Sequence, residues 1–190
     1  MPFVHSRLRI AGVVLLVSAL GGWVWSTGNE PEIDAVMTTP GEVPYPALDT
    51  NEPVVGKQLP NTQLTDLDGN TIALQSFVGS PVILNFWYST CEPCRREIPA
   101  FVQAQQTNAN IRFVGFNMND SPEIAKAFGE KYGINYPIVF DQSGTVIREL
   151  GIVTAPSTLF IDSTGNIVDQ VAGEISSDKL ASLISQWFTS

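Results

Sequence analysis

Cys91 and Cys94, the only cysteines among 190 residues, follow directly after the run Val82–Trp87, which is apolar except for Asn85. An apolar run of this length predicts a strand that is buried on both faces of a sheet. A Cys-x-x-Cys pair that leaves such a strand and enters a helix has both sulfur atoms on one helix face. This arrangement indicates a pair of thiols that can form and break a disulfide.

The two cysteines have different predicted roles. Cys91 is expected at the N-terminus of the helix, where unpaired backbone N–H groups and the positive end of the helix dipole stabilise a thiolate. We therefore expect Cys91 to be the nucleophile. Cys94, one helical turn further along, is placed to attack the resulting mixed disulfide and release a reduced partner.

Two structural roles for this cysteine pair explain the pattern less well than redox chemistry. As a structural staple, the disulfide would close a very short loop, for which the chain-entropy model gives about 2 kcal/mol of stabilisation. A structural zinc site lacks a second pair of ligands, because there is no other cysteine and the one histidine is His5. We therefore expect a redox-active disulfide and no metal or other cofactor.

The charge balance excludes one class of partner. The chain has 10 basic and 19 acidic residues, so no basic surface is expected that would bind a phosphate backbone. We find no internal repeat and no glycine-rich phosphate loop with its lysine. The sequence therefore predicts one folded domain without a nucleic-acid or nucleotide partner.

Residues 1–26 are predicted to form a membrane anchor or a signal segment. The run Ile10–Trp25 has no charged residue and, with its flanking residues, is just long enough to span a bilayer. Arg7 and Arg9 precede this run, and the next basic residue is Lys57. The positive-inside rule then predicts a single-pass protein of the cytoplasmic membrane, with everything after the span on the extracytoplasmic side.

An uncleaved anchor is favoured over a cleaved signal peptide because Trp23 and Trp25 suit the far membrane interface. Cleavage near the small residues Val17–Ala19 is the alternative, and it would give a secreted protein. Residues 27–54 contain five prolines and six acidic residues. This composition is typical of a semi-extended acidic linker.

Residues 55–190 have the pattern of an α/β domain. Asp68-Gly69 lies between two short strand-like pieces, which is a strong hairpin signal. Strands and helices then alternate, and this alternation predicts a mixed sheet covered by helices on both sides. The expected strands lie within 63–74, 82–87, 111–118, 137–140, 157–161 and 166–171, and the expected helices span about 92–106, 121–132, 145–150 and 176–187.

This region resembles the thioredoxin fold, and more narrowly the membrane-anchored thiol reductases of the TlpA and ResA type. The resemblance covers roughly residues 54–190, and the segment between Ile111 and Phe140 matches the helix and strand inserted in that group. It therefore implies a thioredoxin-like domain with an N-terminal hairpin and an inserted helix and strand. The motifs that carry it are Asn85-Phe86-Trp87, Cys91-Glu92-Pro93-Cys94, Pro99 and the segment Ala155–Ile161.

The resemblance also assigns roles to residues outside the cysteine pair. Pro156 matches the cis-proline that faces the cysteines, where the flanking backbone would pair with an extended substrate peptide. Glu97 matches an acidic residue near the active site; if buried, it would have a raised pKa and take the proton from Cys94. A solvated Glu97 paired with an arginine is the alternative. The expected substrate groove comprises Trp87, Thr90, Glu92, Pro93, Ala155 and Pro156.

Two positions depart from the family pattern. Thr90 stands directly before the first cysteine, where many proteins of this fold have tryptophan, so a different choice of partner is expected. Asn85 stands where thioredoxin has a buried acid, which leaves Glu97 as the nearby replacement.

By resemblance, the expected function is extracytoplasmic reduction of disulfides in exported proteins. Apocytochrome c is the implied substrate, and a transmembrane thiol protein is the implied electron donor. A disulfide oxidase or isomerase would use the same residues at a less reducing potential. A peroxiredoxin-like peroxidase would need proline and threonine where this chain has Asn85 and Tyr88, and a copper chaperone would want a histidine in the folded domain.

Overall fold

The computed structural model describes residues 51–188. The anchor or signal segment predicted over residues 1–26 lies outside this range, as does most of the linker predicted over residues 27–54. No helix within residues 51–188 is long and apolar enough to cross a membrane. The described end of the linker packs against the domain, because the Val54 side chain is fully buried.

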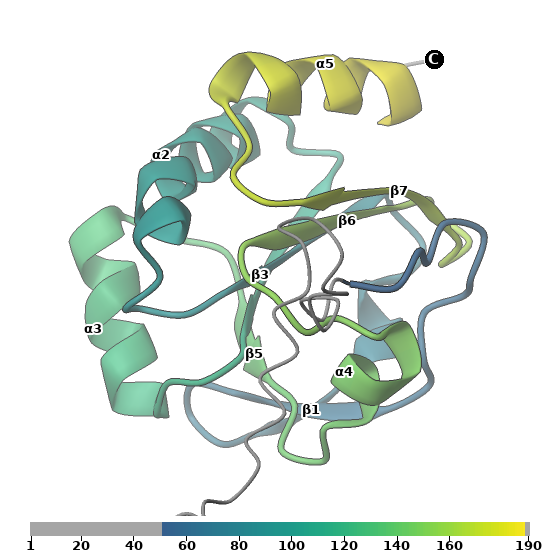
Figure 1. Ribbon diagram of the computed structural model, residues 1–190. Helices are drawn as coiled ribbons and strands as arrows, with labels where there is room; N and C mark the ends of the chain where they lie inside the picture. Colours follow the sequence, from purple (N-terminus) through teal and green to yellow (C-terminus); the bar gives the residue numbers. More distant parts are fainter. Residues whose placement is uncertain (1–50, 189–190) are drawn as a thin grey trace, which may run out of the picture. The chain divides into compact units, whose positions relative to one another are not determined.

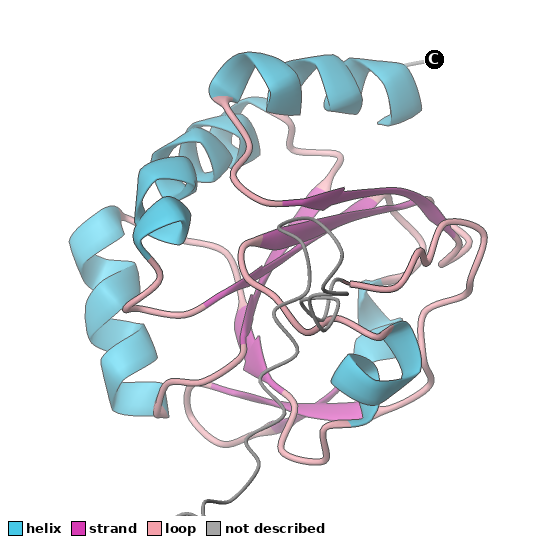
Figure 2. Ribbon diagram, in the orientation of Figure 1, coloured by secondary structure: helices cyan, strands magenta, loops and turns pink. Residues whose placement is uncertain are grey.

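Seven strands form one mixed sheet (Figures 1 and 2). They are β1 (Gln63–Asp66), β2 (Thr71–Ala73), β3 (Val82–Trp87), β4 (Arg112–Asn117), β5 (Ile138–Phe140), β6 (Ser157–Ile161) and β7 (Ile167–Ala172). The spatial order is β2-β1-β5-β4-β3-β6-β7. The pairs β3–β4 and β4–β5 are parallel, and the other four pairs are antiparallel. The predicted mixed sheet, with a hairpin near each end of the domain, is confirmed.

Helices cover both faces of this sheet. They are the 3₁₀ helix η1 (Leu74–Phe77) and the α-helices α2 (Glu92–Thr107), α3 (Pro122–Tyr132), α4 (Thr145–Leu150) and α5 (Ser177–Phe188). Figure 1 shows α2, α3 and α5 on one side of the sheet and α4 on the other. The helix α3 and the strand β5 lie between Ile111 and Phe140, the segment in which an inserted helix and strand were expected.

Strand β3 explains why both sheet faces are apolar. Leu84 and Phe86 belong to the core cluster beneath α4 and η1, whereas Ile83 and Trp87 belong to the clusters beneath α2, α3 and α5. Successive side chains of a strand point to opposite faces, so an almost continuous apolar run fills two cores. Asn85 shares the α2 face with Ile83 and Trp87, and is therefore a buried polar residue next to the cysteine helix.

Two large apolar side chains on the helices are exposed. The side chain of Ile124 is 51% exposed and that of Trp187 is 41% exposed. In α3 the buried face is rotated towards Ala125 and Gly129. A Cβ atom at Gly129 would lie 3.1 Å from Ile138 Cδ1, so this small residue lets the helix approach β5 closely.

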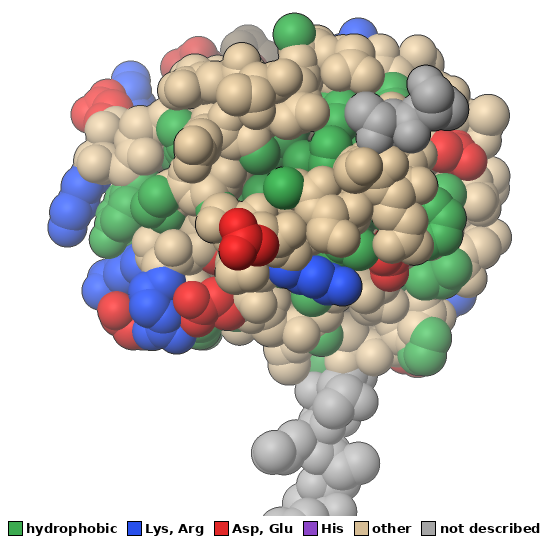
Figure 3. Space-filling model, turned by 90° about the horizontal axis from the view of Figure 1, so that it is seen from above, with side chains coloured by type: hydrophobic (Ala, Val, Ile, Leu, Met, Phe, Trp, Pro, Cys, Tyr) green, Lys and Arg blue, Asp and Glu red, His purple; other side chains and the backbone are tan. Residues whose placement is uncertain are grey.

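Charged side chains are distributed without a continuous basic surface on the face shown in Figure 3. Basic and acidic side chains lie next to one another along one edge of this face, and uncharged side chains occupy most of the rest.

Candidate functional site

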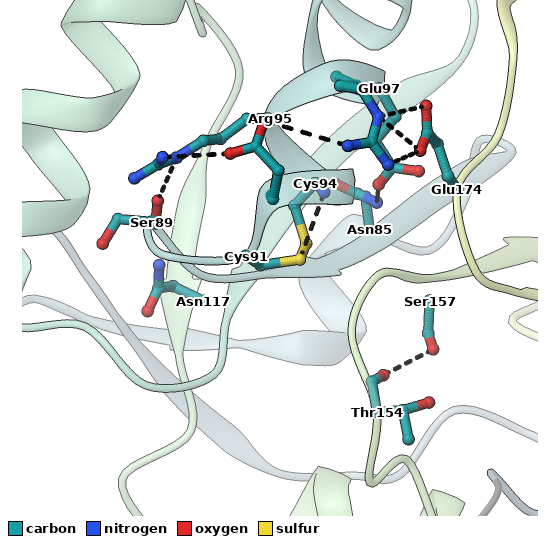
Figure 4. Close-up of a disulfide and its surroundings, with 12 residues drawn as sticks. Asn85, Ser89, Cys91, Cys94, Arg95, Glu97, Asn117, Thr154, Ser157 and Glu174 are labelled. Atoms are coloured by element: carbon teal, nitrogen blue, oxygen red, sulfur yellow. Dashed lines mark hydrogen bonds and ion pairs between the residues drawn. A yellow bond between two sulfur atoms is a disulfide. The ribbon is translucent and has the colours of Figure 1, made fainter.

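Cys91 and Cys94 form a disulfide at the N-terminus of α2 (Figure 4). Their Cα atoms are 5.3 Å apart. Cys91 is the N-cap residue of α2, and its Sγ accepts a hydrogen bond of 3.3 Å from the backbone N–H of Cys94. Cys91 is 4% exposed and Cys94 is fully buried, so a substrate reaches the sulfur of Cys91 first. Pro93 lies in the first turn of α2, where a missing backbone N–H costs no helical hydrogen bond.

A carboxylate clamps the loop that leads into the disulfide. Asp120 accepts hydrogen bonds of 2.6 Å from both the backbone N–H and the hydroxyl of Ser89. It also accepts a bond of 2.8 Å from the amide of Asn117, the last residue of β4. On the other side, Arg95 Nε donates to the Ser89 carbonyl at 2.8 Å. The segment before Cys91 is thus held by residues of two neighbouring elements.

Sequence reasoning did not identify Asn117 and Asp120. A signal for them exists, because Asn117 lies at the end of the strand expected within 111–118 and Asp120 follows it. The carboxyl ends of neighbouring parallel strands meet at one sheet edge, where sites in α/β proteins form.

Pro156 directly precedes strand β6. The peptide bond Ala155–Pro156 is cis. Strand β6 runs antiparallel to β3 with Ser157 opposite Phe86, so Pro156 continues this register to the end of β3, where the cysteine loop begins. Ala155 packs against the apolar cluster that contains both cysteines.

Glu97 is a buried carboxyl group, only 1% exposed, one turn beyond Cys94 in α2. Its Oε1 accepts a hydrogen bond of 2.8 Å from the amide of Asn85, and its Oε2 accepts one of 3.0 Å from the backbone N–H of Ile175. Burial raises the pKa of Glu97 from 4.5 to about 7, although both hydrogen bonds act in the opposite direction. Of the two environments considered for Glu97, the structure has the buried one.

The charged residues around the disulfide form exposed ion pairs. Arg95 pairs with Glu92 at 3.3 Å, and Arg96 donates three hydrogen bonds to the carboxylate of Glu174. The Arg96 pair lowers the pKa of Glu174. Glu97 is therefore not the partner of either arginine. Within residues 51–188, no group of three or more side chains of the metal-ligating types lies together.

The residues predicted for the substrate groove differ in exposure. Thr90 and Glu92 are exposed, whereas Pro93 and Ala155 are half-buried and Pro156 is buried. Trp87, which was also predicted to line the groove, is fully buried. Its ring stacks on Phe128, with centroids 4.7 Å apart, because its position in β3 points it towards the helices. Trp87 therefore supports the disulfide from the interior and offers no surface to a substrate.

This chain is similar to known proteins in both sequence and structure. Residues 55–170 match the AhpC/TSA family. The thiol-disulfide oxidoreductase ResA is 30% identical over 128 residues in Bacillus anthracis and 32% identical over 120 residues in Bacillus subtilis. These alignments cover 66% and 62% of this chain, and 74% and 67% of the respective relatives.

The solved structure of MTB dsbF in its mixed oxidized and reduced forms is also similar. It has 29% sequence identity and a TM-score of 0.63, with 70% of this chain and 98% of that chain covered. The chain therefore belongs to the AhpC/TSA family and is a thiol-disulfide oxidoreductase similar to ResA.

Proposed function

We propose that this protein is a membrane-anchored, extracytoplasmic reductase of disulfides in exported proteins. Apocytochrome c is the proposed substrate, and a transmembrane thiol protein is the proposed electron donor. The similarity to ResA supports this class of reaction. The single observation that carries the reducing direction is the buried carboxyl group of Glu97 beside Cys94.

The proposed reaction begins with the reduced protein. The Cys91 thiolate attacks one sulfur of the substrate disulfide, that disulfide breaks, and the leaving substrate thiolate takes a proton from solvent. Cys94 then passes its proton to Glu97 and attacks Cys91 Sγ. This step forms the Cys91–Cys94 disulfide and breaks the mixed disulfide between Cys91 and the substrate. The second substrate sulfur leaves as a thiolate and takes a proton from solvent, so two electrons pass from the protein to the substrate. The donor thiols then reduce the disulfide again.

Glu97 favours this direction for an electrostatic reason. A strong oxidant needs a stabilised thiolate, because its reduced form must be the more stable one. A carboxylate in a poorly solvated interior opposes a second negative charge nearby. Above a pH of about 7, where Glu97 ionises, its charge destabilises the reduced, thiolate-bearing protein relative to the disulfide.

The reduction potential of the full-length protein tests the direction of exchange. It is measured in a series of redox buffers by thiol trapping, with fluorescence of Trp87 as a second probe because this ring packs in the same cluster as the disulfide. A potential near or below that of thioredoxin, about −270 mV, is expected. A potential near that of DsbA, about −120 mV, would refute the reductase in favour of an oxidase.

The substrate and the location need their own tests. Deletion of the protein in its host is expected to reduce the amount of c-type cytochromes, and added thiol reductant is expected to restore it. Normal cytochrome levels in the deletion strain would refute apocytochrome c as the substrate. Protease added to intact spheroplasts is expected to digest the domain, and a protected domain would refute the extracytoplasmic location.

A further inference from the structure

Asn51, the first described residue, binds the loop that precedes the cis-proline. Its Oδ1 accepts hydrogen bonds from the backbone N–H of Val153 at 2.8 Å and of Thr154 at 2.9 Å. The Thr154 hydroxyl donates to the same oxygen at 3.1 Å, and Asn51 Nδ2 donates to the hydroxyl of Ser157. One side chain thus contacts residues on both sides of Ala155 and Pro156.

The residues after Asn51 hold it in place. The backbone N–H of Glu52 donates to the carbonyl of Gly151 at 3.1 Å, and Val54 is fully buried. The side chain of Gln170 in β7 accepts a hydrogen bond from the Val54 N–H and donates one to the Glu52 carbonyl. Because β7 belongs to the sheet, Asn51 is attached to a rigid part of the domain.

The loop itself has few other attachments near the disulfide. Val153 and Thr154 are exposed, and the Ser157 hydroxyl donates to the Thr154 carbonyl at 2.7 Å within the same loop. Among residues 51–188, no hydrogen bond reaches the backbone of Ala155. Figure 4 shows Thr154 on the loop before β6 and Ser157 at the start of that strand, in the surroundings of the disulfide. On the far side of Ala155, the Pro156 carbonyl accepts a hydrogen bond of 2.8 Å from the N–H of Gly173, so that end is attached to the sheet. The bonds from Asn51 hold the other end, at Val153 and Thr154.

We propose that Asn51 is a positioning residue for the substrate groove: by holding the backbone of Val153 and Thr154, it sets the place of Ala155 and Pro156 opposite Cys91. Asn51 does not touch the reacting sulfur atoms. This inference rests on the proposed function only in assuming that a protein disulfide binds along this loop. It applies equally to reduction and to oxidation of that disulfide.

Three variants of the full-length protein test the role of Asn51. Asn51→Ala removes all four side-chain hydrogen bonds, whereas Asn51→Asp keeps the oxygen that accepts from Val153 and Thr154. Val54→Ala is the matched control, because it destabilises the same segment through lost packing and leaves the Asn51 side chain intact. The thermal unfolding of each variant gives its loss of stability.

The first readout needs no substrate. In Asn51→Ala, hydrogen exchange at the amides of Val153 and Thr154 is expected to be at least about tenfold faster, because each loses its hydrogen-bond acceptor. Asn51→Asp is expected to retain the protection of these amides. Unchanged exchange at both amides in Asn51→Ala would overturn the inference.

The second readout separates a positioning role from a merely structural one. Insulin serves as a protein substrate that contains disulfides. Its KM is expected to rise by about tenfold in Asn51→Ala, a change that corresponds to the loss of about one net hydrogen bond. The rate with the small disulfide 5,5′-dithiobis(2-nitrobenzoate) is expected to stay within about twofold of the wild type, since a small disulfide makes no use of the groove. Asn51→Asp should restore the KM.

An equal rise of KM in Asn51→Ala and Val54→Ala at equal loss of stability would also overturn the inference. The reduction potential decides the proposed function independently. An oxidising potential refutes the reductase and leaves the role of Asn51 standing, whereas an unchanged KM refutes the role of Asn51 and leaves the reductase standing.

Discussion

Replacing Glu97 by glutamine should change how the stability of the oxidised protein depends on pH. Glu97 is almost completely buried, and its pKa is raised from 4.5 to about 7, mainly by burial. Glutamine has nearly the same shape but never ionises. It can accept the hydrogen bond from Ile175 with its oxygen, and its amide can donate to Asn85 Oδ1, which has no hydrogen-bond partner among residues 51–188.

The sign and the size of the effect follow from proton binding. Below pH 4.5, Glu97 is protonated in both the folded and the unfolded protein, so it adds no pH dependence. Between pH 4.5 and about 7, the unfolded chain releases this proton while the folded protein retains it, and the free energy of unfolding falls as pH rises. At about 1.4 kcal/mol per pH unit, the loss in the wild type amounts to about 3 kcal/mol and is complete above pH 7.

Urea unfolding of the oxidised wild type and Glu97→Gln, measured from pH 4.5 to pH 8, checks this prediction. The difference in free energy of unfolding between the two proteins cancels the titration of all other groups. As pH rises, this difference should change by about 3 kcal/mol, with Glu97→Gln becoming more stable relative to the wild type. Glu130→Gln, which makes the same replacement at an exposed position of α3, is measured in parallel as the matched variant. A difference that moves by less than about 0.5 kcal/mol for Glu97→Gln would refute the reasoning.

Three further predictions concern the surroundings of the disulfide. Cys94→Ser should accumulate a mixed disulfide with insulin on non-reducing gels, whereas Cys91→Ser should form none; trapping by Cys91→Ser instead would reverse the assigned roles. Gly115→Ala should lower the free energy of unfolding in urea by about 1–3 kcal/mol and change the fluorescence of Trp87, because the new Cβ would lie 2.8 Å from Trp87 Nε1. Unchanged stability and fluorescence would contradict this packing. Asp120→Ala should lower the free energy of unfolding in urea by about 2 kcal/mol, because three hydrogen bonds to the Asp120 carboxylate are lost. A loss below about 0.5 kcal/mol would show that these hydrogen bonds contribute little to stability.

Local patterns were sufficient to predict the elements that carry the cysteines. The apolar run of β3, the proline and cysteines at the start of α2, and Ser121 before α3 each act within a few residues of their own position. Ser121 indeed caps α3 by accepting a hydrogen bond from the Ile124 N–H, and α2 begins directly after Cys91. Such signals depend on backbone geometry and periodicity, so they can be recognised without knowledge of the tertiary structure.

Short-range patterns in the sequence by itself therefore determined the α/β class, the disulfide and the unequal places of its two sulfur atoms, and the resemblance of its motifs to a known family implied the thioredoxin-like fold. The tertiary structure alone decided the environment of Glu97, whose spacing from Cys94 suits a solvated ion pair as well as a buried acid. Here Asn85 and Ile175 surround Glu97, while Arg96 turns to Glu174, 78 residues away in the sequence. Likewise, Asn51 meets Val153 across 102 residues, and Trp87 is covered by Phe128. Burial and long-range hydrogen bonds depend on which distant segments the fold brings together, and no local pattern encodes that.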